Sequence, residues 1–220
     1  STMLLTLWLN ALLVLTCVPG SLVPLLSRGR EDRRTRAFLL TIGAVVLLVC
    51  LTRMLIHDGA AGFAARSAVL RTVAGMVLIL IGGVVAYVLE ALSSLWARLG
   101  SLRGWHNAID LGEYRMLLGP LLIVPALEEA CYRWCLFTVA AMVGLGNWQS
   151  AMLSVPAFVL GHVVVDGLAG LRKVFLAVVA CGVFVLAGLP GAVLLHVLFN
   201  LLVFLRKFAD AADFSARRLM

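Results

Sequence analysis

Long apolar runs separated by short polar stretches make up most of the 220-residue sequence. A helix of about 20 apolar residues is long enough to cross the hydrocarbon core of a bilayer. We expect transmembrane helices in seven segments: residues 4–26, 37–56, 72–92, 116–143, 148–165, 174–189 and 191–205. The pattern therefore predicts an all-α fold, a polytopic membrane helix bundle of about seven spans.

The connection between the third and fourth runs, residues 93–115, is more polar than the other connections. Its large apolar side chains nevertheless recur at near-helical spacing: Leu95, Trp96, Leu99, Leu102, Trp105 and Ile109. An amphipathic segment with tryptophans and arginines is typical of a helix that lies at the lipid headgroups. An interfacial helix here would make eight helices in all.

The composition excludes a soluble globular domain. Hydrophobic residues make up 63% of the sequence and the mean hydropathy is +1.07, whereas soluble domains are about 45–50% apolar. A bundle of about seven spans uses the whole length. We therefore expect one integral membrane domain, residues 1–220, with no separate soluble module.

The net charge of +7 does not indicate nucleic-acid binding, because the basic residues lie in short loops beside apolar runs. Such residues set membrane topology and contact anionic lipids. With seven spans, fourteen lysines and arginines fall on one side and three on the other. This asymmetry predicts an outer N-terminus and a cytoplasmic C-terminus. Arginine far outnumbers lysine, which is typical of a GC-rich prokaryotic genome, so we expect a prokaryotic cytoplasmic membrane.

Candidate chemistry is concentrated in the fourth apolar run. Between Met116 and Gly146 the only charged residues are Glu128, Glu129 and Arg133. An ionisable group at this depth costs at least about 2.5 kcal/mol and indicates function by default. Glu129 and Arg133 are four residues apart, which favours an ion pair on one helical face. Glu128 is turned about 100° away, so it faces a cavity and needs another partner.

Two histidines in apolar runs are the available partners. Phe158 precedes His162 by four residues, and His196 precedes Asn200 by four. Each spacing keeps two side chains on one helical face. Counting about 1.5 Å per residue from the expected span ends places these polar groups and Glu128 in the middle of the bilayer. Three different spans can therefore converge on one pocket.

This set of groups suits hydrolysis of an amide by water. A carboxylate beside an imidazole in a dry site can take a proton from water and generate a nucleophile. A second histidine and an asparagine amide are donors that can stabilise the oxyanion formed when water adds to a peptide carbonyl. The apolar runs hold no Ser-His-Asp set. The residues therefore favour a mechanism without a covalent intermediate.

Together, the three motifs resemble the CAAX protease and bacteriocin-processing (CPBP) family of intramembrane endopeptidases, which includes the CAAX prenyl endopeptidase. The resemblance rests on ordered motifs: Glu128-Glu129-x-x-x-Arg133, Phe158-x-x-x-His162 and His196-x-x-x-Asn200. It covers about a third of the chain and defines a family-like core of approximately residues 116–206. What it implies is an all-helical, membrane-embedded catalytic cavity.

The resemblance also implies roles. Glu128 would activate water together with His162, and His196 with Asn200 would form the oxyanion site. Supporting residues would surround them: Glu129, Arg133 and Phe158. The substrate would be a peptide or protein with a membrane-associated cleavage site, near the C-terminus in the CAAX precedent.

Two alternatives stay open. The same Glu128, His162 and His196 could instead ligate zinc, although an amide such as that of Asn200 is a poor zinc ligand. We therefore expect no cofactor. The chain could also be a non-catalytic scaffold or immunity protein whose polar groups only stabilise helix packing. Glu90, near the end of the third span, is expected to snorkel to the interface.

Overall fold

The computed structural model describes residues 2–27, 31–56, 72–99 and 119–217, and every regular element in them is helical. The first half contains α1 (Thr2–Cys17), η1 (Pro19–Leu22), α2 (Val23–Ser27), α3 (Glu31–Ile56) and α6 (Val73–Leu99). The second half contains η3 (Gly119–Ile123), α7 (Val124–Glu129), η4 (Ala130–Cys135), α8 (Leu136–Met142), α9 (Asn147–Asp166), η5 (Gly167–Lys173) and α10 (Val174–Arg217). The predicted all-α fold is confirmed.

Three segments of the described chain are long and apolar enough to cross a membrane: residues 34–56, 73–93 and 147–206. The last of these contains α9, η5 and most of α10. The full set of seven spans therefore stays a prediction. Of the expected interfacial segment 93–115, residues 93–99 form the end of α6. The rest of that segment lies outside the described residues.

Glycine and proline divide two of the helical runs. The first expected span is divided: α1 ends at Cys17, and the 3₁₀ turn Pro19–Leu22 and the short helix α2 follow it. α10 is two helices joined at Gly188, whose φ of 72° lies in the left-handed region. Glycine adopts that region without a Cβ clash, and Pro190 cannot continue a preceding helix without a lost hydrogen bond. This break falls where the sequence predicts a boundary between two spans.

The α7 segment is flanked by two π-helical turns, η3 and η4. Pro125 has no N–H to donate to the preceding turn, which accounts for a wider turn before α7. After α7, the carbonyl oxygen of Tyr132 in η4 accepts a hydrogen bond of 2.6 Å from Ser154 Oγ of α9. Single π-turns inside helices occur frequently at functional sites, and this one follows directly after the paired acids.

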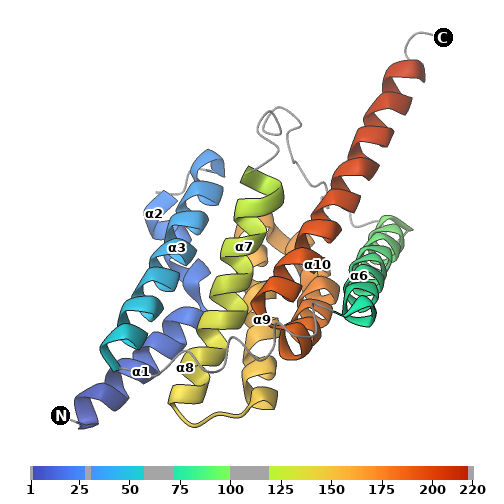
Figure 1. Ribbon diagram of the computed structural model, residues 1–220. Coiled ribbons are helices and arrows are strands. Elements are labelled where there is room, and N and C mark those ends of the chain that lie inside the picture. Colours follow the sequence, from blue (N-terminus) through green and yellow to red (C-terminus); the bar gives the residue numbers. More distant parts are fainter. Residues whose placement is uncertain (1, 28–30, 57–71, 100–118, 218–220) are drawn as a thin grey trace.

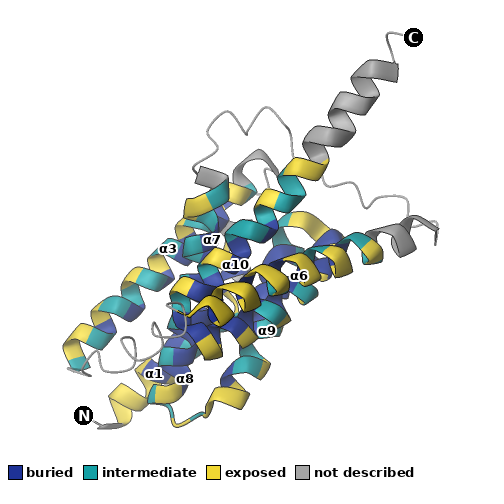
Figure 2. Ribbon diagram, turned by 45° about the vertical axis from the view of Figure 1, so that its right-hand side comes forward, coloured by how far each residue is buried: buried dark blue, intermediate teal, exposed yellow. Residues whose placement is uncertain are grey.

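In space, the run from α7 to α8 lies in the middle of the bundle (Figure 1). α1 and α3 lie on one side of it, α9 and α10 lie on the other, and α6 packs on the outer side of α10. Exposed residues recur along α6 as far as Leu92 (Figure 2). They include Leu80, Ile81, Val84 and Val85. An apolar outer face of this kind fits contact with lipid.

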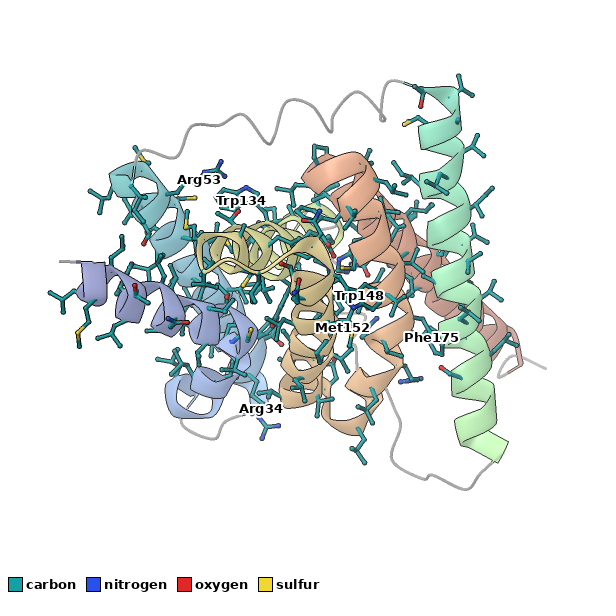
Figure 3. The ribbon with its side chains drawn as sticks, turned by 90° about the horizontal axis from the view of Figure 1, so that it is seen from below. Arg34, Arg53, Trp134, Trp148, Met152 and Phe175 are labelled. Atoms are coloured by element: carbon teal, nitrogen blue, oxygen red, sulfur yellow. The ribbon has the colours of Figure 1, made fainter. Side chains whose placement is uncertain are left out.

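Figure 3 shows the same arrangement from below, with α6 standing at the edge of the bundle and apolar side chains projecting around it. At the other edge Arg53 of α3 lies beside Trp134 of η4, with the guanidinium carbon 6.0 Å from the ring centroid. A cation over an indole face stabilises a surface contact by about 0.5–1 kcal/mol. This contact helps to hold α3 against the central run.

Two glycines allow α6 to approach α10 closely. A Cβ on Gly83 would lie 2.8 Å from Leu198 Cδ2, and one on Gly82 would lie 3.0 Å from Leu195 Cδ1. Small residues at such contacts are typical of helix packing in membranes. We predict that Gly83→Leu lowers the free energy of unfolding by about 1–3 kcal/mol, the usual cost of overpacking.

The measurement is an unfolding titration in detergent, with Gly182→Leu as the matched control. A Cβ on Gly182 of α10 would meet nothing within 4 Å, so the same substitution there should be tolerated. Equal effects of the two substitutions would show that the α6–α10 contact does not depend on Gly83.

Candidate active site

The paired acids occupy the last turn of α7 and are both buried: Glu128 is 5% exposed and Glu129 0%. Arg133 follows in η4 and is also 0% exposed. Carboxylates and guanidinium groups are almost never buried to this degree unless they are paired. Their partners therefore define the site.

Glu129 and Arg133 form the ion pair that their spacing predicts, with 3.2 Å between Arg133 Nε and Glu129 Oε2. Arg133 Nη2 also donates to the carbonyl oxygen of Ala177 in α10, at 3.2 Å. The guanidinium carbon lies 4.2 Å from the centroid of the Phe158 ring, a cation–π contact that is stronger in the absence of water. Arg133 thus joins the central run to both α9 and α10.

Glu129 has a second partner that the sequence did not indicate. Its Oε1 lies 2.8 Å from Nδ1 of His196 in α10. A carboxylate accepts hydrogen bonds only, so the imidazole donates its Nδ1–H. Glu129 therefore bridges Arg133 and His196 instead of serving Arg133 alone. Helical spacing reveals partners on one helix, and this partner lies on another.

His162, like His196, is held through its Nδ1 atom. Its Nδ1 lies 3.0 Å from the carbonyl oxygen of Phe158, one turn earlier on α9. A carbonyl oxygen can only accept, so Nδ1 again carries the hydrogen and Nε2 is left for another contact. His162 Nε2 lies 3.7 Å from Glu128 Oε1.

Glu128 therefore lies between two imidazoles. Its Oε2 is 3.5 Å from His196 Nε2, while its Oε1 faces His162 Nε2. Both separations exceed the usual 2.7–3.2 Å of a direct hydrogen bond, and a polar contact of this length commonly includes a bridging water. The three predicted residues Glu128, His162 and His196 are thus brought together by α7, α9 and α10.

Phe158 packs at the centre of these groups and is fully buried. Its ring centroid lies 4.4 Å from that of His162 and 5.8 Å from that of His196. Together with the guanidinium of Arg133 on the same ring, these contacts restrict the orientation of both imidazoles. A side chain without polar atoms can do this without competing for their hydrogen bonds.

Asn200 lies one turn beyond His196 on α10 and is half-buried. Among the described residues no hydrogen-bond partner of its amide is found. The structure therefore places Asn200 on the same helix as His196 but does not join it to the carboxylate–histidine cluster.

Glu90 does not snorkel, and that expectation was wrong. It is 8% exposed, and Lys173 Nζ of η5 lies 3.4 Å from its Oε1. The same ammonium lies 4.6 Å from the centroid of the Phe199 ring in α10. A partner on η5, 83 residues away, makes burial of Glu90 more favourable than reaching the interface. The pair links α6 to the helices that carry the histidines.

The zinc alternative requires at least three ligand side chains arranged around one point. Within residues 2–27, 31–56, 72–99 and 119–217, no group of three or more His, Cys, Asp or Glu side chains is arranged to hold a metal ion. The chemistry below is therefore derived from the side chains alone, and metal dependence is left to experiment.

The fold and the site define a class: an all-helical protein with long apolar helices and a buried cluster of carboxylates and histidines contributed by α7, α9 and α10. Residues 111–202 match the model of the Rce1-like family, described as type II CAAX prenyl endopeptidase Rce1-like. Over residues 111–202 this match confirms the resemblance to the CPBP family of CAAX proteases that the motifs indicate. A match to this family points to an intramembrane protease, a hydrolase acting on a peptide or protein. No similar curated protein and no similar solved structure was found.

Proposed function

We propose that the protein is an intramembrane endopeptidase that hydrolyses a peptide bond of a membrane-associated peptide or protein with water activated by Glu128. The observation that carries this proposal is the position of the Glu128 carboxylate between His162 Nε2 and His196 Nε2. Each imidazole has its other nitrogen held by a separate acceptor.

This arrangement favours binding of water. With Nδ1 donating, a neutral His162 presents a lone pair at Nε2. This lone pair and the Glu128 carboxylate, 3.7 Å apart, are two acceptors without a donor between them, which is unfavourable in a low-dielectric interior. A water molecule has two O–H groups and can donate to Glu128 and His162 at once. We therefore place the nucleophilic water between these two side chains.

The reaction follows from these positions. The water oxygen attacks the carbonyl carbon of the peptide bond while one of its protons passes to Glu128. Protonated Glu128 then returns that proton to the amide nitrogen as the C–N bond breaks, leaving a carboxylic acid, which keeps the second proton of the water, and an amine.

The oxyanion formed in between accepts hydrogen bonds from His196 and the amide of Asn200. His196 donates from Nε2 as an imidazolium, which takes up its second proton from solvent before the substrate binds and keeps it through the reaction. Glu129 behind its Nδ1 stabilises that imidazolium, as a carboxylate does in a catalytic triad.

We further propose that the chain crosses a prokaryotic cytoplasmic membrane seven times, with the N-terminus outside and the C-terminus in the cytoplasm. Its partners would be membrane lipids and a substrate cleaved near a membrane-associated C-terminus. The excess of basic residues in one set of loops and the apolar surface of the helices support this placement.

The test is cleavage of a quenched library of membrane-anchored peptides by the purified protein in nanodiscs. We expect cleavage at one or a few positions near the anchored segment. A folded wild-type protein that cleaves no member of a library covering C-terminal and internal sites would contradict the proposal and favour the scaffold alternative.

Metal dependence separates carboxylate activation from zinc activation. We predict that a strong chelator changes the cleavage rate by less than about twofold, because the nucleophile is generated by general base catalysis. The measurement is the initial rate before and after dialysis against chelator, with a zinc protease treated alongside. Loss of activity that added zinc restores would transfer the mechanism to metal-bound water.

A further inference from the structure

The helix that carries His162 is packed against the backbone of another segment at that residue. η5 lies against α9, and Gly170 of η5 contacts the peptide bond that follows His162. A Cβ on Gly170 would lie 2.5 Å from both the carbonyl carbon of His162 and the nitrogen of Val163. It would lie 2.7 Å from the carbonyl oxygen of His162. Contacts this short are not tolerated, so any larger residue must move the two segments apart.

The atoms involved make this contact unusual. A clash with the end of a side chain is relieved by a rotamer change, whereas all three neighbours of Gly170 are backbone atoms. Relief therefore requires a shift of α9 or η5. The close return itself begins at Gly167, whose φ of 63° is accessible to glycine at little cost.

α9 is also held from a second direction, one residue earlier. A Cβ on Gly161 would overlap the hydroxyl oxygen of Tyr132 and would lie 3.3 Å from Phe38 Cε2. Gly20 of η1 approaches the same point, since its own Cβ would lie 3.4 Å from Gly161 Cα. The backbone on both sides of His162 is thus fixed by close packing rather than by hydrogen bonds of its side chain alone.

We infer that Gly170 is a positioning residue for His162: its contact with the His162–Val163 peptide bond sets how far the imidazole Nε2 lies from Glu128, a separation of 3.7 Å. This inference rests on the proposed function, in which the water lies between those two groups. A displacement of α9 would misplace the general-base pair without removing any group that binds substrate. It should therefore lower kcat and leave KM nearly unchanged.

The test compares Gly170→Ala with Gly182→Ala in the full chain in nanodiscs. A displacement on the scale of 1 Å can cost up to about 100-fold in rate, so we expect kcat of Gly170→Ala to fall about 10- to 100-fold. KM should stay within about twofold. Gly182→Ala adds its methyl group where nothing lies within 4 Å and should keep the wild-type kcat. A folded Gly170→Ala protein whose kcat is within twofold of this control would overturn the inference.

A second readout does not depend on activity. In ¹⁵N-histidine NMR, Gly170→Ala should move the imidazole signals of His162 and leave those of His196 in place, and Gly182→Ala should move neither. If the wild type cleaves nothing, the proposed function fails, yet moved His162 signals would still support the positioning role. Unmoved signals would overturn it.

The contact between Gly161 and Tyr132 allows a rescue experiment that can be used if Gly170→Ala does not fold. Tyr132 Oη is buried and finds no hydrogen-bond partner among the described residues, so Tyr132→Phe should fold normally. That substitution removes the atom that a methyl group on Gly161 would overlap. We expect Gly161→Ala to shift the His162 signals and Gly161→Ala/Tyr132→Phe to restore them in part. A Gly161→Ala protein with wild-type signals would argue against positioning of His162 by backbone packing.

Discussion

Replacement of Arg133 by methionine is expected to lower the free energy of unfolding by about 3–5 kcal/mol, the usual cost of breaking a buried ion pair from one side. Both members of the pair are fully buried, so Glu129 would keep a charge with no guanidinium to compensate it. The substitution also removes the hydrogen bond to Ala177 and the cation over Phe158. The measurement is an unfolding titration in detergent that compares Arg133→Met with the wild type.

Two further proteins show whether the effect comes from the uncompensated charge. Arg53→Met is the matched control, because Arg53 is only partly buried and its cation–π contact with Trp134 is long. It should cost no more than about 1 kcal/mol. Arg133→Met/Glu129→Gln removes both charges and should recover much of the lost stability. If Arg133→Met costs no more than Arg53→Met, the ion pair has no structural role.

The double variant Arg133→Met/Glu129→Gln also separates the effect on stability from the effect on catalysis. The double variant keeps a side-chain oxygen beside His196 Nδ1 but not a carboxylate. We therefore expect a folded protein with a lower kcat, because the hydrogen bond from His196 Nδ1 no longer ends on a negative charge.

The apolar runs predicted the long helices well because a long apolar run is a strong indication of a membrane helix. A bilayer-sized run of apolar residues has few alternatives to a helix, and the expected runs at 37–56, 72–92 and 148–165 lie within α3, α6 and α9, apart from one residue at the start of the second. The break near residue 190 was also predicted, because Gly188 and Pro190 act locally. The short helix α1 and the π-turns around α7 were not predicted, because a hydropathy pattern does not report which carbonyl each N–H reaches.

The sequence likewise predicted some contacts of the candidate site and missed others. Residue types and order predicted that Glu128, His162 and His196 lie together, since ionisable groups in apolar spans are rare and costly, and the structure shows this proximity. Spacing on one helix was sufficient for the Glu129–Arg133 pair. The bond from Glu129 to His196 depends on how two helices are rotated against each other, and no pattern within one segment encodes that rotation.

Glu90 and Gly170 illustrate the same limit. Glu90 was expected at the interface because only its position along one span was considered, and its buried partner Lys173 comes from a distant segment. Gly170 lies in a short connection where a glycine has an ordinary explanation in a turn. Its contact with the backbone at His162 follows only from the return of η5 onto α9.

The second large effect concerns catalysis. Glu128→Gln keeps the size of the side chain but cannot accept the proton of the attacking water. General acid–base groups contribute about 10²- to 10⁴-fold to a rate, so we expect kcat to fall by this factor with little change in stability. Glu90→Gln is the matched control, because it neutralises a carboxylate of similar burial (8% exposed, against 5% for Glu128) outside the histidine cluster.

The most direct test of Glu128 as the general base is therefore to compare cleavage rates of one identified peptide. Wild type, Glu128→Gln and Glu90→Gln are reconstituted in the same nanodiscs, and the rates are corrected for folded protein. We predict that Glu128→Gln loses at least about 100-fold in kcat while Glu90→Gln stays near the wild type. Equal rates for wild type and Glu128→Gln would contradict it, because the bond would then be hydrolysed without the carboxylate that lies between the two histidines.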